Sequence, residues 1–268
     1  MASTRDIRCR ASRAGAKTGE AMLQRMALLC VVCLMGCGGK RLPSGPGSPP
    51  DPVEDGWDPE SPGNEERMYG TDDWARFIVD VPMRDEPGTV TRYCTGGVVL
   101  LGAVLEHVSG RSIADLSRDW LFSPMQVQDV TWQPAGKTGT DTGGHLRLRP
   151  RDFLKVGQLM LDGGAWHGER QVSEAWVTES GKALGPLGDV NYGLLWWSAR
   201  FVIQGTPVEV TFARGNGGQY VFVAPSLGVT AAFTGSHYND AGSAFPLVLF
   251  GQYVLPAALG LERPGTGG

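Results

Sequence analysis

The hydrophobic periodicity of this chain changes near residue 190, and that change limits the folds that it can adopt. Before it, apolar residues recur at helical spacing in segments that end at Gly or Pro. After it come four short β-prone runs and a final apolar helix from about Ala241 to Leu259. The runs are Tyr192 to Trp197, Val208 to Ala213, Gln219 to Ala224 and Val229 to Thr234. Helices followed by an antiparallel meander predict an α+β fold, with the last helix on one face of the sheet.

Start and stop signals divide the helical part into five predicted helices. In the longest, Cys94-Thr95-Gly96-Gly97 precedes the helix and Ser109-Gly110 ends it. Its apolar stripe is expected at Leu100, Leu101, Val104, Leu105 and Val108. The others are a capped helix in TDDWARFIVDVP with Trp74, Phe77 and Ile78 on one side, a capping-box helix from Ser112 to Phe122, a helix from Pro150 that closes at Gly163-Gly164, and a helix from Val172 to about Glu179. Residues 126–148, which lie between the helix that ends at Phe122 and the one that begins at Pro150, are expected to form a loop.

Composition allows one sizeable globular domain and excludes several functions. The chain has 268 residues, 41% of them hydrophobic, and a formal net charge of -4. That charge gives no electrostatic reason to expect nucleic acid as a partner. None of the four histidines stands near cysteines or carboxylates at a metal-ligand spacing, so we predict ordinary roles for them, no metal and no cofactor. They are His107, His145, His167 and His237.

Residues Met22 to Cys37 have the layout of a secretory signal, because Arg25 precedes an apolar core that is too short to span a bilayer permanently. The ending Leu34-Met35-Gly36-Cys37 resembles a bacterial lipobox, which implies lipidation of Cys37. We therefore predict an exported cell-envelope protein that is anchored to the membrane by a lipid. The predicted parts are an extension and signal at 1–37, a Pro/Gly-rich tether at 38–70, a globular domain at 71–262 and a tail at 263–268.

Tyr93 lies in the stretch PGTVTRYCTGGVVLLGAVLEHVSG, at the mouth of the longest predicted helix. Its phenol could handle a proton, or its ring could simply pack against the core. From these residues alone, packing is the favoured interpretation.

Taken in order, several segments resemble the β-lactamase-related serine hydrolases, a broad family of class C β-lactamases, D-alanyl-D-alanine peptidases and related amide and ester hydrolases. The resemblance is strongest to the branch that includes 6-aminohexanoate-dimer hydrolase and covers roughly Tyr69 to Leu259. It rests on PGTVTRYCTGGVVLLGAVLEHVSGRS, LFSPMQVQDVTW, GGHLRLRPRDFLKVGQLMLDGGAWHGERQVSEAWV, YGLLWW and ARGNGGQYVFVAPSLGVTAAFTG.

The resemblance implies a cleft where three elements meet: a Ser-x-x-Lys helix, a Tyr-x-Asn or Tyr-x-Ser loop, and a strand with Lys/His-x-Gly. Tyr93 matches the family's general acid or base, and Thr95 stands where Asn or Ser is usual. The strand motif corresponds to Arg214-Gly215-Asn216-Gly217-Gly218-Gln219, without the usual Lys or His. The implied substrate-binding residues are Thr95, Asn216, Gly217 and Gly218. Lys137-Thr138-Gly139 copies the strand motif in the wrong place, and we treat it as a coincidence.

The Ser-x-x-Lys element is not found, because no serine in the 268 residues has a lysine three positions later. The first hypothesis is therefore a family hydrolase that is inactive alone, with a small amide, ester or peptide as the family's substrate. The alternative is a non-catalytic lipoprotein that binds a peptide or a cell-wall fragment. A third hypothesis, which makes Cys94 the nucleophile, lacks a base that is visible in the sequence.

The resemblance also bears on the expected shape of the domain. A fold of β-lactamase/transpeptidase type is implied, without the family's N-terminal helix and first strands. The sheet would then keep an open edge, through which the chain could associate with itself.

Overall fold

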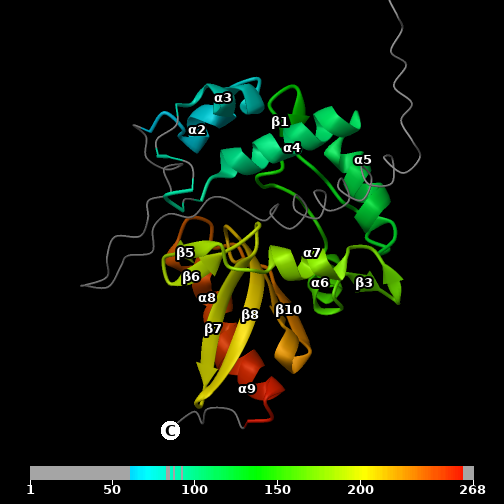
Figure 1. Cartoon of the computed structure of the whole chain (residues 1–268), viewed down its shortest axis with the longest axis vertical. Helices are drawn as coiled ribbons and strands as arrows, with labels where there is room; N and C mark the ends of the chain where they lie inside the picture. The colour runs from blue at the N-terminus through cyan, green and yellow to red at the C-terminus, as the bar shows by residue number, and fades with distance from the viewer. Residues whose placement is uncertain (1–60, 83–84, 87, 92, 262–268) are drawn as a thin grey trace, which may run out of the picture.

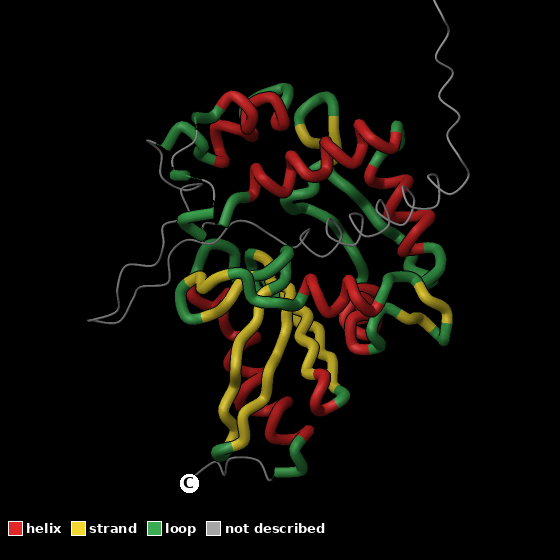
Figure 2. Tube along the Cα trace, viewed as in Figure 1, coloured by secondary structure: helices red, strands yellow, loops and turns green. Residues whose placement is uncertain are grey.

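A computed structural model of the chain describes residues 61–82, 85–86, 88–91 and 93–261. Cys37, the predicted signal and most of the predicted tether lie outside these residues. Figures 1 and 2 show the first helices gathered at one end of the molecule and the main sheet at the other. The overall order, helices then an antiparallel sheet then a terminal helix, is the one predicted.

Three helices form the beginning of the helical end, of which α3 and α4 were predicted and α2 was not. The helix α2 (Glu65–Tyr69) falls in the predicted tether, so the ordered part begins earlier than Thr71. The helix α3 (Trp74–Asp80) is capped by the Asp73 carboxylate, as predicted. The helix α4 (Thr95–Ser109) begins after Cys94 and ends at Gly110 in the left-handed conformation, so both predicted ends are confirmed.

The buried face of α4 differs from the predicted apolar stripe. Leu105 is buried as predicted, but Val104 and Val108 are exposed, whereas Val98, Val99 and Gly102 are buried. At Gly102 a Cβ atom would lie 2.3 Å from the Oγ1 atom of Thr142, so only glycine permits this close approach. The side of α4 that faces the interior is thus set by close contacts at small residues such as Gly102, and not by the number of apolar residues on each side of the helix.

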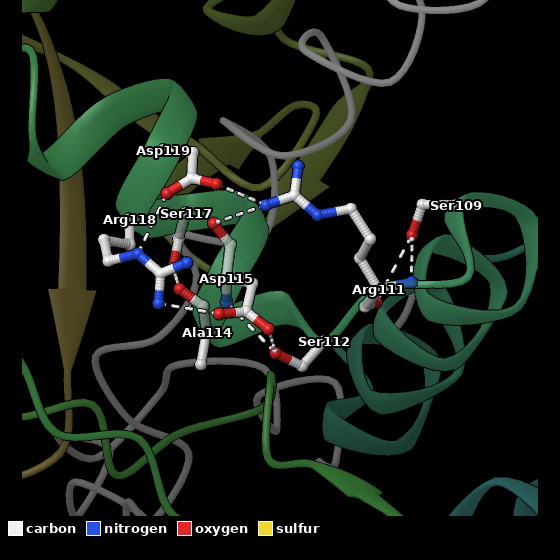
Figure 3. A network of polar contacts seen from close by, with 8 residues as sticks. All are labelled: Ser109, Arg111, Ser112, Ala114, Asp115, Ser117, Arg118 and Asp119. Carbon is white, nitrogen blue, oxygen red and sulfur yellow. Dashed lines mark hydrogen bonds and ion pairs between the residues drawn. The ribbon is translucent and has the colours of Figure 1, made fainter.

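A sharp corner follows α4, where α5 (Ile113–Ser117) and the π-helical turn η2 (Arg118–Phe122) leave at 82°. The Ser112 hydroxyl accepts a hydrogen bond from the Asp115 amide, which confirms the predicted cap. Figure 3 shows the charged side chains around it: Arg118 pairs with Asp115 at 2.6 Å, and Arg111 pairs with Asp119. These side chains are 39–57% exposed, so their ion pairs contribute little to stability.

Short elements then connect the helical end to the main sheet. The hairpin of β1 (Pro134–Ala135) and β2 (Gly139–Thr140) occupies part of the predicted loop. Within it, Lys137 pairs with Asp72 at 2.6 Å on the surface. The helix α6 (Pro150–Leu161) has proline in its first turn, as predicted, and is followed by β3 (Ala165–Trp166), β4 (Glu169–Arg170) and α7 (Glu174–Ser180).

The main sheet has six antiparallel strands in the order β10-β9-β8-β7-β6-β5, so each strand neighbours the next along the chain. Its strands are β5 (Gly185–Leu187), β6 (Val190–Tyr192), β7 (Trp197–Ile203), β8 (Thr206–Gly215), β9 (Gln219–Ala224) and β10 (Val229–Phe233). The last three match predicted strands within a few residues. The predicted strand from Tyr192 to Trp197 is wrong: it spans the turn between β6 and β7, and the β5–β6 hairpin was not predicted. Those short, partly exposed strands have too few apolar residues for a period to show.

Helices cover both faces of this sheet (Figure 1). Val221 and Val223 of β9 join the cluster formed with α6, whereas Phe222 of β9 stacks on Phe250 with 4.2 Å between the ring centroids. Strand β9 is buried on both sides, which explains why its sequence is continuously apolar.

The terminal helical segment is built from η4 (Ala241–Ala244), α8 (Phe245–Leu249), η5 (Phe250–Val254) and α9 (Leu255–Ala258). The predicted helix from Ala241 to Leu259 is thus confirmed, though with 3-10 and π-helical turns in it. Its length and mean hydropathy of 1.3 would suffice to cross a membrane. In this fold one side of the segment packs on the sheet, where Phe250 and Leu255 are fully buried, whereas only 22% of the whole segment is buried.

Candidate active site

Tyr93 lies immediately before the cap of α4, where the helical end meets the sheet. Its half-buried ring stacks on Trp197, with centroids 5.5 Å apart, and meets the edge of Tyr192 at 5.6 Å. Tyr192 and Trp197 are register partners on β6 and β7. The guanidinium of Arg214 on β8 lies 4.5 Å from the centroid of the Trp197 ring, which is cation–π distance. Trp197 therefore joins Tyr93 to the beginning of the predicted strand motif.

The turn from β8 to β9 carries the rest of that motif, and it is tied to residues 235–239. The Asn216 side chain makes hydrogen bonds of 3.0 and 3.1 Å with Asn239, and the Gln219 amide donates to the Gly235 carbonyl at 2.6 Å. Gly217 has a φ of +85°, and a Cβ atom there would lie 2.6 Å from the Tyr238 ring. Both facts favour glycine at this position. These internal hydrogen bonds therefore fix the shape of the turn.

Thr95 contacts the helical end and not the β8–β9 turn. It is buried, and its hydroxyl bonds to the Glu65 carboxyl of α2. The predicted role of Thr95 in binding substrate thus remains a prediction, as do those of Asn216, Gly217 and Gly218. Cys94 is exposed, and its Sγ atom accepts a hydrogen bond of 3.4 Å from the Gly97 amide, so in this structure its thiol caps α4.

A polar cluster beside the start of α4 was missed by sequence reasoning. In it, Tyr69 donates a hydrogen bond to Glu65, and His145 Nδ1 lies 2.7 Å from the Oδ2 atom of Asp141. The rings of Tyr69 and His145 meet edge to face at 6.3 Å. The only sequence signal was Asp141 four residues before His145 with Gly143-Gly144 between them, a spacing that suits an Asx turn.

Burial and hydrogen bonding shift two pKa values in this cluster. Burial raises the pKa of the Glu65 carboxyl, and hydrogen bonds from the Tyr69 and Thr95 hydroxyls oppose part of that rise. The hydrogen bond to the Asp141 carboxylate raises the pKa of His145, although burial of the ring acts against it.

Within the described ranges, no three His, Cys, Asp or Glu side chains come together to hold a metal ion. One surface cavity of about 410 Å³ lies along α3, and none of the predicted site residues lines it.

Comparison with known proteins identifies the family. The sequence model of the family described as Beta-lactamase matches residues 45–247, which is more than half of the chain. The chain belongs to this family. The fold agrees, because a Bacillus anthracis protein assigned as a 6-aminohexanoate-dimer hydrolase superposes with a TM-score of 0.61 at 15% identity, over 90% of this chain and 62% of that one. The D-amino acid amidase of Ochrobactrum anthropi SV3 superposes with a TM-score of 0.54 at 17% identity, over 88% and 91%.

Two curated relatives are similar in sequence. Penicillin-binding protein 4 of Amycolatopsis lactamdurans is 27% identical over 200 residues, which is 61% of this chain and 52% of that protein. The 6-aminohexanoate-dimer hydrolase of Paenarthrobacter ureafaciens is 29% identical over 97 residues, 35% of this chain and 25% of that enzyme. The chain thus spans between a quarter and about half of the curated relatives that it matches. The predicted family and fold class are confirmed: the chain belongs to the family of β-lactamase-related proteins and has a β-lactamase/transpeptidase-like fold.

Proposed function

We propose that this chain supplies the tyrosine side of an amide- or ester-hydrolysing site of β-lactamase type, with Tyr93 as the group that transfers the proton. The observation that supports this most directly is the stack of Tyr93, Trp197 and Arg214, because it joins the loop before α4 to the β8–β9 turn. This shared contact with Trp197 supports the proposal that the Tyr93 loop and the β8–β9 turn are two of the three elements that the family uses.

The third element decides whether the chain is active by itself. An acyl-serine forms only when a neighbouring group takes the proton of the serine hydroxyl, and no serine here has a lysine three positions later. We therefore expect that the purified chain does not react with a fluorophosphonate, as measured by intact mass, while trypsin in a parallel sample does. A labelled serine would overturn the expected inactivity and identify a different nucleophile.

The role of Tyr93 can be tested with the same fluorophosphonate assay. If the DNA upstream of the Tyr69 codon encodes a Ser-x-x-Lys helix in any frame, that helix is expressed together with this chain. Labelling should then appear, and Tyr93→Phe should slow it by about a hundredfold or more, the usual effect of losing a general acid or base. Equal labelling of the Tyr93→Phe chain would contradict the role proposed for Tyr93. If no upstream helix exists and no label forms, the alternative of a non-catalytic lipoprotein gains support.

We also propose that the domain is exported and held at the bacterial membrane by lipid on Cys37. The support is the apolar run of residues 26–35, followed by Gly36-Cys37 and a Pro/Gly-rich segment. Expressed in a bacterium, the chain should sediment with membranes and carry a lipid mass on Cys37. The Cys37→Ala variant should lose both, whereas Cys33→Ala should keep them. A soluble, unmodified wild-type protein would refute the anchor.

A further inference from the structure

The short helix α2 is joined to α4 through a buried carboxyl group. Glu65 is only 4% exposed. Its carboxyl accepts hydrogen bonds from the hydroxyl of Tyr69, one turn later in α2, and from the hydroxyl of Thr95, the first residue of α4. A helix of five residues is not stable by itself, so α2 depends on these contacts and on the packing of Met68 to stay in place.

Glu65 differs from the other buried carboxylates in how its charge is compensated. Asp152 pairs with Lys155 at 2.7 Å, and Asp141 lies 2.7 Å from the Nδ1 atom of His145. Within the described ranges, Glu65 makes no ion pair, and its hydrogen-bond partners are the two hydroxyls. Ionisation of Glu65 therefore places a charge in the interior without a paired cation, which costs free energy.

The imidazole of His145 is held next to this carboxyl group. Its ring meets the ring of Tyr69 edge to face, with 6.3 Å between the centroids, and the Tyr69 hydroxyl binds Glu65. Asp141 fixes the ring through Nδ1. His145 also has a φ of +60°, which few residues other than glycine adopt. The loop thus keeps an ionisable ring beside the pair of Glu65 and Tyr69.

We propose that Glu65, Tyr69 and His145 form a pH-sensitive latch that holds α2 on α4 in acid and loosens it as the pH rises. In acid the Glu65 carboxyl is neutral, and the hydroxyls satisfy it. At higher pH Glu65 ionises, first beside a charged His145 ring and then, once that ring has lost its proton, without this compensating charge. Release of α2 returns the carboxylate to water and removes the cost of its burial. The latch goes beyond the proposed hydrolysis and does not rest on it.

The pKa shift of Glu65 has the sign that the latch needs. Burial raises the pKa of its carboxyl, and the hydrogen bonds from the two hydroxyls oppose part of that rise. A pKa that is raised only while α2 is docked stabilises docking fully below the ordinary pKa of the group. This contribution is lost as the pH rises through the raised value. Docking of α2 is therefore tightest in acid.

His145 adds a second step at higher pH. Its pKa is raised by the hydrogen bond to Asp141 and by the charge of Glu65, whereas burial of the ring and the charge of Arg147 lower it. The contribution of Asp141 persists when α2 leaves, because both residues belong to the same loop. Only the attraction between Glu65 and the imidazolium is lost, so deprotonation of His145 weakens docking by that amount.

Loosening of α2 affects the two segments that it joins. The helix falls in the last residues of the predicted tether, so its release adds to the free length of that segment. Thr95 also loses its hydrogen-bond partner, two residues after Tyr93. The latch therefore connects the pH to the segment that carries Tyr93.

Hydrogen exchange of the full chain, followed by mass spectrometry, measures the docking of α2. Exchange of residues 61–70 is compared at each pH with that of the same peptide in isolation, which removes the effect of pH on intrinsic exchange. Protection should fall by about tenfold or more between about pH 5 and about pH 9, the effect expected when docking raises the pKa of Glu65 by about one. Protection of α6, which is far from the latch in the sequence, should not change over this range.

Variants of Glu65 test the origin of the pH dependence. Glu65→Gln and Glu65→Met are neutral at every pH, and the second needs no hydrogen bond. At least one of them should keep α2 protected at about pH 5, and in that variant protection should stay within about twofold up to about pH 9. Loosening of α2 by both changes at about pH 5, or a pH dependence that persists in them, would overturn the proposal.

His145→Asn, which tolerates positive φ, tests the second step. At about pH 6 it should weaken protection of α2 severalfold, because an ionised Glu65 then has no imidazolium beside it. Combined with the neutral variant of Glu65, the same change should have no effect. His237→Asn, at the other exposed His–Asp pair, is the matched control and should leave α2 unchanged. An equal effect of His145→Asn with and without Glu65 would contradict the latch. No substrate is used, so these outcomes are independent of the fluorophosphonate assay.

Discussion

Replacing Trp197 by alanine is expected to lower the free energy of unfolding by about 3–5 kcal/mol, the usual cost of truncating a buried aromatic residue. Trp197 is 5% exposed and belongs to the cluster between the sheet and the terminal helix. The ring of Trp197 also contacts Tyr93, Tyr192 and Arg214. Its loss therefore removes core volume and also the contact that joins Tyr93 to the strand motif. Urea unfolding followed by circular dichroism measures the change.

Two further variants separate these contributions. Trp197→Phe keeps an aromatic face for Tyr93 and should recover more than half of the lost stability. Arg214→Met keeps most of the side-chain volume and removes the cation, so only the cation–π contribution, about 0.5–2 kcal/mol, should disappear. If Trp197→Ala unfolds at nearly the wild-type urea concentration, the packing of Tyr93 on the sheet is not what the structure indicates.

Local signals were sufficient for most element ends. The Ser112 cap, the proline in the first turn of α6 and the Gly110 end of α4 are each determined by one or two residues and their neighbours. Of the predicted stripe of α4, Leu105 is buried, but Val104 and Val108 were predicted wrongly because the orientation of the helix depends on Gly102 meeting Thr142, a contact between residues forty positions apart. No periodicity within the helix contains that information.

The candidate site was predictable to the same extent. The resemblance to the family singled out Tyr93 and the turn at Gly217, and the roles of both residues remain predictions. It could not place Trp197 between them, because YGLLWW was read as one strand and the structure makes it a turn followed by β7. Nor could it find the Glu65 contact of Thr95, which brings together residues of two helices. Long-range contacts of buried polar groups have no signature in composition.

The two edges of the main sheet are protected differently. Among the described residues no strand pairs with the outer side of β10 or of β5. At one edge, β5 contains Pro186, which has no N–H to offer to another strand. At the other, β10 has the sequence VTAAF, without charge or proline. Unprotected edges of this kind pair readily, and an identical strand related by a two-fold axis is self-complementary.

The terminal helix adds apolar surface to the same molecule. Val248 and Tyr253 are 49% and 54% exposed, and Phe245 and Leu249 are exposed as well. We therefore expect two copies of the chain to associate, with both the edge strand β10 and this helix face contributing. Burial of two such side chains stabilises by several kcal/mol in total, so Val248→Glu with Tyr253→Glu should weaken the dimer by well over tenfold in sedimentation equilibrium.

The matched control uses apolar side chains that are even more exposed but lie elsewhere. Val202 on β7 and Leu184 before β5 are 65% and 66% exposed. Val202→Glu with Leu184→Glu adds the same charge to the chain, so general repulsion would weaken the dimer equally in both double variants. Weakening confined to the terminal helix pair would locate the interface there. The five-residue edge strand β10 is uncharged, so nothing in its own sequence opposes pairing with a second copy. A wild-type chain that stays monomeric at high concentration would therefore show that the edge of β10 is not accessible to another strand.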